Sequence, residues 1–313
     1  QENLLGVLHA APILVGRECY ETVRCVDSDA ADCIHLGDTA HGTPVDITRA
    51  VAEADFRICL GNIEFHYFAG YSGGRKSILP GICGKKTVQD NHARMVEILD
   101  HMPPIRENPI SLEMIEAARK VGVNFVFNAV MNADNQVVRL VAGDLVEAWY
   151  EAVDTSSSMY EIPFTEPVDI AVSSACGYPR DVNWYQAQKA IDHADKIVKS
   201  GGTIIVCGEC RDGYGNKVFE EWMKKKLPPE EVMREIRAHF VLGGHKAFAF
   251  AKVASEKRLV LVSSMNAEDT AALYGTKAAS VQEAFDQAVA ACPDASIAIM
   301  PEGGLTLPVH MNA

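Results

Sequence analysis

The sequence of 313 residues has no apolar run that approaches the roughly 20 residues a membrane-spanning helix needs. It also lacks an excess of positive charge. Its net charge is −13, whereas proteins that bind phosphate backbones rely on clustered lysine and arginine. Neither an internal repeat nor a low-complexity segment stands out. These absences predict a protein that binds no nucleic acid and no membrane, with a length sufficient for two domains.

The cysteines lack a framework pattern. There are nine, an odd number, scattered along the chain, which favours a reducing cytoplasm over secretion. Cys207 and Cys210 have the spacing of a redox or metal pair, but they directly follow an apolar run, and no second pair completes a tetrahedral site. We interpret them as a strand end with incidental thiols and expect a cytoplasmic protein.

The beginning of the sequence also lacks expected features. Gln1 is not an initiator methionine, and no charged-then-apolar signal segment follows it. We therefore expect that a part of the protein upstream of Gln1 is missing from this sequence.

Hydrophobic patterns predict an α/β protein whose first half mixes short strands and helices. A strand that leads straight into a glycine-rich loop is the arrangement of phosphate sites in α/β sheets. The predicted strands of this half are residues 22–26, 56–60, 124–130 and 136–140, the last two forming a hairpin turned at 132–135. The predicted helices are residues 47–53, 87–100 with Thr87 as N-cap, 109–121 and 145–158.

The pattern changes after residues 161–167, where two prolines interrupt the periodicity and predict a domain boundary. Apolar runs separated by helical stretches follow, as expected for buried parallel strands. These predicted strands are residues 168–172, 203–207, 259–263 and 295–300.

The loop that follows the second predicted strand contains charged and potentially reactive residues that core packing does not require. Residues 61–81 combine a histidine, several glycines, Arg75 and Lys76. Glycines let the backbone adopt positive φ and approach a ligand, and the two cations offer charge to an anionic group. A desolvated lysine can also act as a nucleophile, although most lysines are solvated surface residues. The glycines concerned are Gly70, Gly73 and Gly74.

The order of these residues resembles the nickel-pincer lactate racemase family. The resemblance rests on His66, the run from Gly70 to Ser77, Pro80 with Gly81, and Asn91 with His92, which fall in the family's order and spacing. It extends through most of the chain. In this family the cofactor is a nickel-bearing, pyridinium-derived mononucleotide tethered to a lysine.

The resemblance implies roles for individual residues. Lys76 would hold the cofactor, His92 would bind nickel, and His66 would be one of two catalytic acid/base histidines. Alone, either histidine could be a core residue. Nickel accepts imidazole readily, and a square-planar site that takes most of its ligands from the cofactor needs only one from the protein. The loop residues expected around the cofactor are Ser72, Gly73, Gly74 and Arg75.

The resemblance also implies a further segment upstream of Gln1 that carries the second catalytic histidine. We therefore expect that residues 1–313 alone do not racemise either enantiomer at an appreciable rate.

In the second half, Gln186 and Lys189 lie three residues apart and share one helix face, just past the first strand of the βα series. The resemblance implies that Tyr185, Gln186 and Lys189 bind substrate or cofactor, with the lysine pairing with a carboxylate. A plain amphipathic helix start is the alternative. Residues 211–215 and 243–246, the latter containing His245, are weaker candidates for the same cleft.

These observations together predict a two-domain α/β protein with its active site in the interdomain cleft. Residues 1–163 form an N-terminal cofactor-binding α/β domain that is incomplete at its start. The resemblance implies that residues 300–313 return to this domain. Residues 164–299 form a C-terminal α/β domain with a Rossmann-like parallel sheet.

The function that the resemblance implies is a racemase or epimerase of a 2-hydroxy acid, an isomerase. The cofactor would take the C2 hydrogen as hydride while a histidine takes the hydroxyl proton, giving a 2-oxo acid. Cofactor-maturation proteins are expected partners, whereas the substrate's identity and the oligomeric state stay open. Two alternatives are a nucleotide- or phosphate-binding protein without turnover and an enzyme that forms a Schiff base on Lys76.

Overall fold

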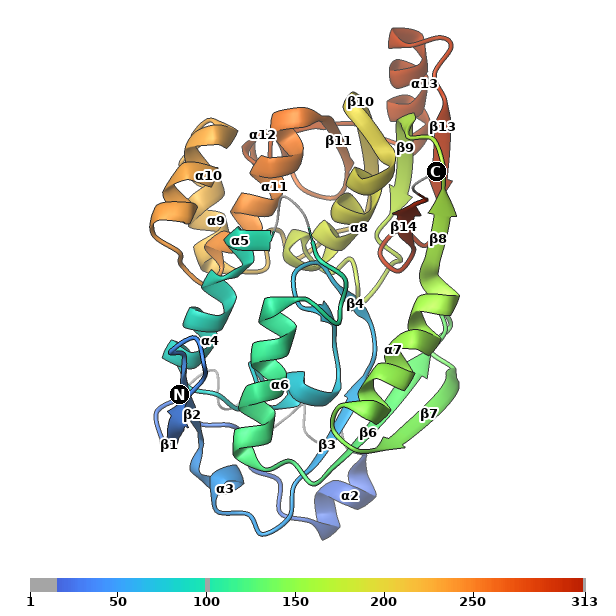
Figure 1. Cartoon of the computed structure of the whole chain (residues 1–313). Coiled ribbons are helices and arrows are strands. Elements are labelled where there is room, and N and C mark those ends of the chain that lie inside the picture. The colour runs from blue at the N-terminus through green and yellow to red at the C-terminus, as the bar shows by residue number, and fades with distance from the viewer. Residues whose placement is uncertain (1–15, 99–101, 312–313) are drawn as a thin grey trace.

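The computed structural model describes residues 16–98 and 102–311. Figure 1 shows an elongated molecule with a three-stranded sheet near one end and a five-stranded sheet near the other. Helices lie beside both sheets, so the predicted α/β class is confirmed. No helix within the described residues is long and apolar enough to cross a membrane.

The three-stranded sheet has the order β3-β6-β7. Strand β3 (Ile58–Asn62) runs parallel to β6 (Phe125–Met131), which pairs antiparallel with β7 (Val137–Gly143). This confirms the predicted hairpin. One face of the sheet packs in a core with α6 (Pro109–Val121) and α7 (Glu147–Tyr160).

The opposite face of this sheet is apolar and exposed. Ile58 and Leu60 on β3 are paired with Phe125 and Phe127 on β6, so all four side chains lie on one face. Leu60 is 70% exposed and Ile58 is 55% exposed. We call this surface the open face. It continues on β7 with Leu140, which is 55% exposed.

The five-stranded sheet is parallel throughout and has the order β12-β11-β10-β9-β13. The strand order reverses at β9, as in doubly wound folds. Both faces are covered, with α8 (Trp184–Ile197) and α11 (Gly244–Glu256) on one side and α13 (Val281–Ala291) on the other. The strands are β9 (Val168–Ser174), β10 (Val198–Cys207), β11 (Arg258–Val262), β12 (Gly275–Lys277) and β13 (Ile297–Met300).

The two halves meet at a small two-stranded sheet. Strand β8 (Glu161–Phe164) lies within the predicted boundary segment and pairs parallel with β14 (Leu307–His310). The chain therefore returns beside residue 161 after β13. The domain limits of 1–163 with 300–313 and of 164–299 stay a prediction.

Two local predictions were wrong. Residues 22–26 do not form a strand, because α2 (Arg17–Thr22) ends there and an extended, unpaired segment follows. Thr87 is not an N-cap: helix α4 (Lys85–Ala93) starts earlier, after Gly84. The Thr87 hydroxyl instead accepts a hydrogen bond from the Asp46 N–H at 3.2 Å. A side chain that bonds a distant backbone group is not visible in a local capping pattern.

The predicted helix of residues 87–100 is also interrupted. It is divided between α4 and α5 (Met95–Ile98), and its predicted end at Asp100 lies outside the described residues. The predicted helix 47–53 is only the short α3 (Arg49–Ala52). The remaining elements are β1 (Cys33–Asp38), β2 (Pro44–Thr48), β4 (Phe65–His66), β5 (Gly70–Tyr71), η1 (Gly74–Ser77), α9 (Lys217–Lys224), α10 (Pro229–Ala238) and α12 (Ala267–Ala272).

Candidate active site

The lysine-bearing loop begins with the hairpin β4-β5, in which His66 lies opposite Gly70. Gly70, Gly73 and Gly74 have φ angles of 78°, 70° and 49°, which confirms the positive φ predicted for them. A Cβ atom at Gly74 would lie 2.7 Å from Cδ1 of Trp149. The loop therefore requires glycine at this position both for its backbone conformation and for its close packing.

Arg75 is fully buried and does not offer its charge to an anion as the sequence had suggested. Its guanidinium donates to the carbonyl oxygens of Tyr71 at 2.7 Å and Ala69 at 2.8 Å, and to Oγ of Ser111 at 2.9 Å. It also stacks 3.7 Å from the ring centroid of Trp149. These contacts stabilise the loop from within. Burial lowers the pKa of Arg75 well below its usual value.

Lys76 follows in η1 and is half-buried. Within the described residues its amine makes no hydrogen bond and no ion pair. Burial lowers its pKa well below the usual value, and the positive charges of Arg75, Lys189 and Lys246 lower it further. A neutral amine is a nucleophile, so the environment of Lys76 suits covalent attachment of a ligand.

His66 and His92 lie on either side of one aromatic ring. The ring centroid of Phe68 is 4.4 Å from that of His66 and 5.0 Å from that of His92. Burial, reinforced by the charge of Lys76, lowers the pKa of both histidines, that of His92 to about 3. Both are therefore neutral near pH 7. The Ala69 N–H donates to Nδ1 of His66 at 3.4 Å, whereas the buried Nδ1 of His92 has no partner among the described residues.

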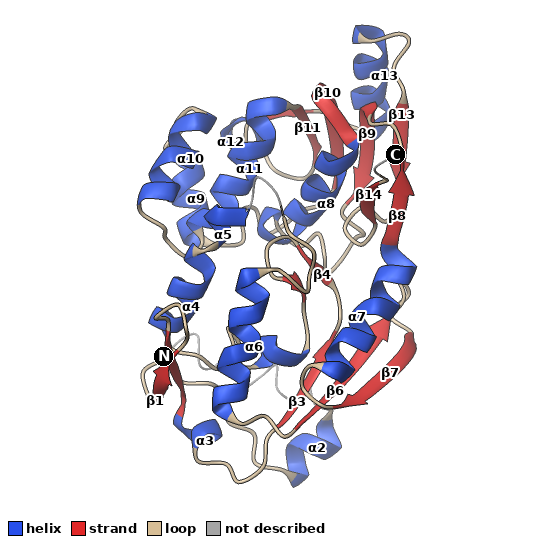
Figure 2. Ribbon diagram, viewed as in Figure 1, coloured by secondary structure: helices blue, strands red, loops and turns tan. Residues whose placement is uncertain are grey.

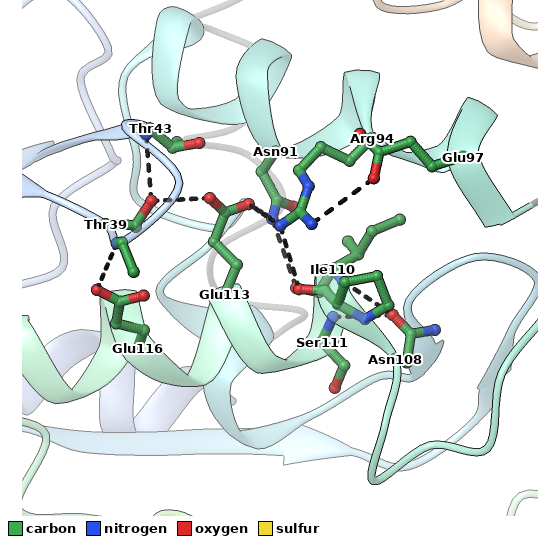
Figure 3. Close-up of polar contacts among 12 residues, drawn as sticks. Thr39, Thr43, Asn91, Arg94, Glu97, Asn108, Ile110, Ser111, Glu113 and Glu116 are labelled. Atoms are coloured by element: carbon green, nitrogen blue, oxygen red, sulfur yellow. Dashed lines mark hydrogen bonds and ion pairs between the residues drawn. The ribbon is translucent and has the colours of Figure 1, made fainter.

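A buried polar network holds the helix that carries His92 (Figure 3). The carboxylate of Glu113 on α6 accepts from Nδ2 of Asn91 at 2.7 Å and from the hydroxyl of Thr39 at 2.8 Å, and Arg94 lies 3.6 Å away. Although burial opposes ionisation, the hydrogen bonds, led by that of Asn91, lower the pKa of Glu113. The network fixes α4 against α6 and thereby the position of His92.

In the second half, α8 supplies the predicted substrate-binding residues. Oδ1 of Asn183 caps this helix by accepting from the Gln186 N–H at 3.1 Å. Nζ of Lys189 lies 3.7 Å from Glu64, a residue beside His66 that the sequence analysis did not single out. Arg180 lies 3.4 Å from the same carboxylate. The ion pair brings Lys189 to the lysine-bearing loop, whereas Gln186 is exposed.

The weak candidate segment 243–246 lies against the same helix. The Gly243 N–H donates to Nδ1 of His245 at 3.0 Å, so the proton of the neutral ring is on Nε2, which faces the hydroxyl of Tyr185 at 3.3 Å. Nζ of the buried Lys246 donates to Oε1 of Gln188 at 2.9 Å. Burial lowers the pKa of Lys246 to about 7.

Charged groups of the second half thus act on the first half, because Lys189 and Lys246 lower the pKa of both Lys76 and His66. The cavities that contact Lys189 are nevertheless small, about 10 Å³ and about 20 Å³. A larger cavity of about 680 Å³ lies beside the hairpin, against Phe65 and Tyr71. The predicted residues therefore converge around a site that is closely packed in this conformation.

Within residues 16–98 and 102–311, no group of three or more histidine, cysteine, aspartate or glutamate side chains could hold a metal ion. All nine cysteines, including Cys207 and Cys210, are unpaired.

The fold and the relatives reported next define the class of this protein as an enzyme, an isomerase. Profiles of two domains match the sequence: the lactate racemase N-terminal domain over residues 9–101 and the lactate racemase C-terminal domain over residues 164–307. The chain belongs to the lactate racemase family, which confirms the resemblance.

Curated relatives agree with this assignment. A lactate racemase of Thermoanaerobacterium thermosaccharolyticum is 32% identical over 299 residues, which cover 92% of this chain and 70% of that protein. A lactate racemase of Lactiplantibacillus plantarum is 32% identical over 294 residues, covering 90% of this chain and 68% of the relative.

Solved structures show the same fold. The lactate racemase apoprotein from Thermoanaerobacterium thermosaccharolyticum superposes with a TM-score of 0.91 at 29% identity, covering 96% of this chain and 75% of that chain. A protein from Thermotoga maritima superposes with a TM-score of 0.70 at 17% identity, covering 90% of this chain and 76% of that one, and it shows the fold alone.

Proposed function

We propose that this protein racemises lactate or a closely related 2-hydroxy acid with a nickel-pincer nucleotide attached to Lys76. The observation that carries the proposal is the environment of Lys76. Its amine has no partner among the described residues, its pKa is lowered by burial, and in its protonated form it lowers the pKa of both His66 and His92. A lysine prepared for covalent attachment beside two neutral histidines fits the resemblance residue by residue.

The residues present fit the implied cofactor. Lys76 offers a nucleophilic amine, and His92 offers a buried Nδ1 that lacks a partner in the described part of the chain. The backbone at Gly73 and Gly74 leaves no room for a Cβ and brings the chain close to its surroundings. We assign Lys76 as the attachment point, His92 as the nickel ligand, and residues 72–75 as the supporting loop. When bound, the cofactor supplies reversible hydride acceptance from C2 of the substrate.

The protein's own groups then handle the proton and the carboxylate. Neutral His66 accepts the proton of the 2-hydroxyl and later returns it. Lys189 binds the substrate carboxylate, which replaces Glu64 as its partner. We assign Gln186 and Tyr185 to the same substrate-binding face of α8. The rings of Tyr67 and Phe68 around His66 exclude water from the reacting atoms.

We also propose a cytoplasmic location, supported by nine unpaired cysteines. Proteins that make and insert the cofactor would then be partners of this chain. The domain limits given above belong to the same proposal, with the active site where the two halves meet.

The test uses protein produced together with cofactor-maturation proteins. L-lactate is supplied, and D-lactate is measured by chiral chromatography. The native protein here means the chain together with the upstream segment that the resemblance implies, and the prediction that residues 1–313 alone do not racemise is unchanged. We expect D-lactate from this native protein and a loss of at least about 100-fold in His66→Asn, since acid–base catalysis contributes typically 10²–10⁴-fold. A nickel-loaded native protein that forms no D-lactate would contradict the proposal. Trapping of a carbonyl compound on Lys76 by borohydride would favour the Schiff-base alternative.

A further inference from the structure

Lys246 is a buried lysine for which the proposed reaction has no role. It is the third residue of α11 and only 4% exposed. Its amine donates to Gln188 on α8 at 2.9 Å. Nζ lies 4.6 Å from the ring centroid of Tyr67 and 5.1 Å from that of Tyr185. Lys246 therefore contacts α8 of the second half and the catalytic loop of the first half.

Tyr67 connects this lysine to His66. The two rings are stacked, with centroids 5.2 Å apart and an angle of 17° between their planes. The buried hydroxyl of Tyr67 has no partner among the described residues. The contacts of Tyr67 are thus made by its ring, which lies against a cation and an imidazole.

Lys246 makes no ion pair with any residue that the structure describes. The ionisable groups around it are Asp192 and Lys189 on α8, together with Tyr67, Tyr185 and His245. Burial and Lys189 lower the pKa of Lys246, while Asp192 opposes this, and burial raises the pKa of Asp192 itself. The hydrogen bond of Lys246 to the uncharged side chain of Gln188 and its contacts with the two tyrosine rings therefore define the position of the amine.

We propose that Lys246 is a positioning residue that fixes the His66 imidazole, through the Tyr67 ring, relative to the face of α8 that carries Lys189. Any catalytic consequence rests on the proposed function, because it requires His66 to be the acid/base group. The mechanical link does not depend on that function. The link predicts that loss of the Tyr67 ring changes the position of the His66 imidazole, whereas loss of the Tyr67 hydroxyl does not.

The structural test follows the His66 ring by NMR in protein labelled at histidine, without cofactor. Lys246→Met keeps the volume and removes the amine, and Tyr67→Leu removes the ring. We expect both changes to shift or broaden the His66 signals. Tyr67→Phe and Lys217→Met, a control at an exposed lysine, should leave them unchanged. Circular dichroism melting of each variant identifies any that does not fold.

Unchanged His66 signals in folded Lys246→Met would overturn the proposal, as would identical effects of Tyr67→Phe and Tyr67→Leu. The catalytic test uses the cofactor-loaded enzyme. Lys246→Met should lower kcat on the order of 10–100-fold with KM for lactate nearly unchanged, as expected when a catalytic group is misplaced. A changed KM with unchanged kcat would contradict positioning of His66. If the native protein forms no D-lactate, the proposed function fails, and the NMR result alone decides the proposed link.

Discussion

The two larger sheets of this protein differ in how their apolar faces are covered. The five-stranded sheet is covered on both faces by helices (Figure 2). Its central residues Ile204, Ile205 and Leu261 are fully buried. Among residues 16–98 and 102–311, the three-stranded sheet is covered on one face only, and Leu60 on its open face is 70% exposed. Burial of both faces gives the second half the pattern of a self-sufficient α/β layer structure, whereas the first half has its core on one side.

The two halves also hold the proposed site residues in different ways. Lys76 follows Gly74, which packs against Trp149, and His92 is fixed by the network around Glu113. Tyr185 and Lys189 instead project from the beginning of α8, beyond the end of a parallel strand. The first half therefore depends on backbone geometry for its chemistry, and the second on side chains of one helix.

The largest effect is expected for His92→Ala. Loss of the imidazole removes the assigned nickel ligand, so nickel per protein should fall to background while the organic part stays attached to Lys76. Elemental analysis combined with intact mass measures both quantities. His35→Ala, at an exposed histidine of the first half, is the control and should retain nickel. Equal nickel content in native protein and His92→Ala would remove His92 from the ligand set.

Gly74→Ala should destabilise the first half. Alanine at this position would have to adopt a positive φ, and its Cβ would lie 2.7 Å from Cδ1 of Trp149. We expect a loss of about 2–4 kcal/mol in the free energy of unfolding. Gly177→Ala in the second half is the matched control: its φ is also positive, at 69°, but nothing lies within 4 Å. It should cost only about 1–2 kcal/mol.

Urea denaturation of the two glycine variants measures this difference. Equal losses would show that close packing against Trp149 contributes nothing to the stability of the loop.

Lys189→Ala should weaken substrate binding. Loss of a charge-assisted partner for the carboxylate costs about 2–3 kcal/mol, which corresponds to a rise in KM of roughly 30- to 150-fold. Steady-state kinetics of the cofactor-loaded enzyme measures it. Lys196→Ala, at an exposed position of the same helix, should leave KM unchanged. An unchanged KM in Lys189→Ala would make Lys189 an ordinary residue of the helix surface.

The smallest effect is expected on the open face. Leu60→Lys should change the free energy of unfolding by less than about 0.5 kcal/mol, because its side chain is already exposed. Leu261→Ala, in the packed sheet, should cost about 2–5 kcal/mol. A loss above about 2 kcal/mol for Leu60→Lys would mean that the open face is covered in solution.

The sequence predicted those elements whose local signals are complete. Helix α6 occupies the predicted residues 109–121, because Asn108 caps it, Pro109 begins it and Gly122 ends it in the left-handed conformation. Four strands of the five-stranded sheet were likewise predicted from their apolar runs, whereas β12 was missed because it has three residues and no such run. Short elements such as β4 and β5 were missed, since two residues carry no periodicity.

The site was predicted less completely than the fold. The order of residues shared with the family identified Lys76 and His92 as candidates. The buried position of the Arg75 side chain was not predicted, because it depends on hydrogen bonds to backbone carbonyl groups and to Ser111, which is distant in the sequence. The contact of Lys246 with Tyr67 joins residues of different halves. No local pattern contains such pairings, because the folded chain alone brings them together.

The attachment of a cofactor to Lys76 is the central claim, and intact mass spectrometry tests it most directly. Native protein and Lys76→Arg, which keeps the charge but not the nucleophilic amine, are produced with the same cofactor-maturation proteins. The account predicts an added mass on the native protein, mapped to the peptide that contains Lys76, and the bare polypeptide mass for Lys76→Arg. The same adduct on Lys76→Arg, or a native protein that racemises lactate without any adduct, would contradict it.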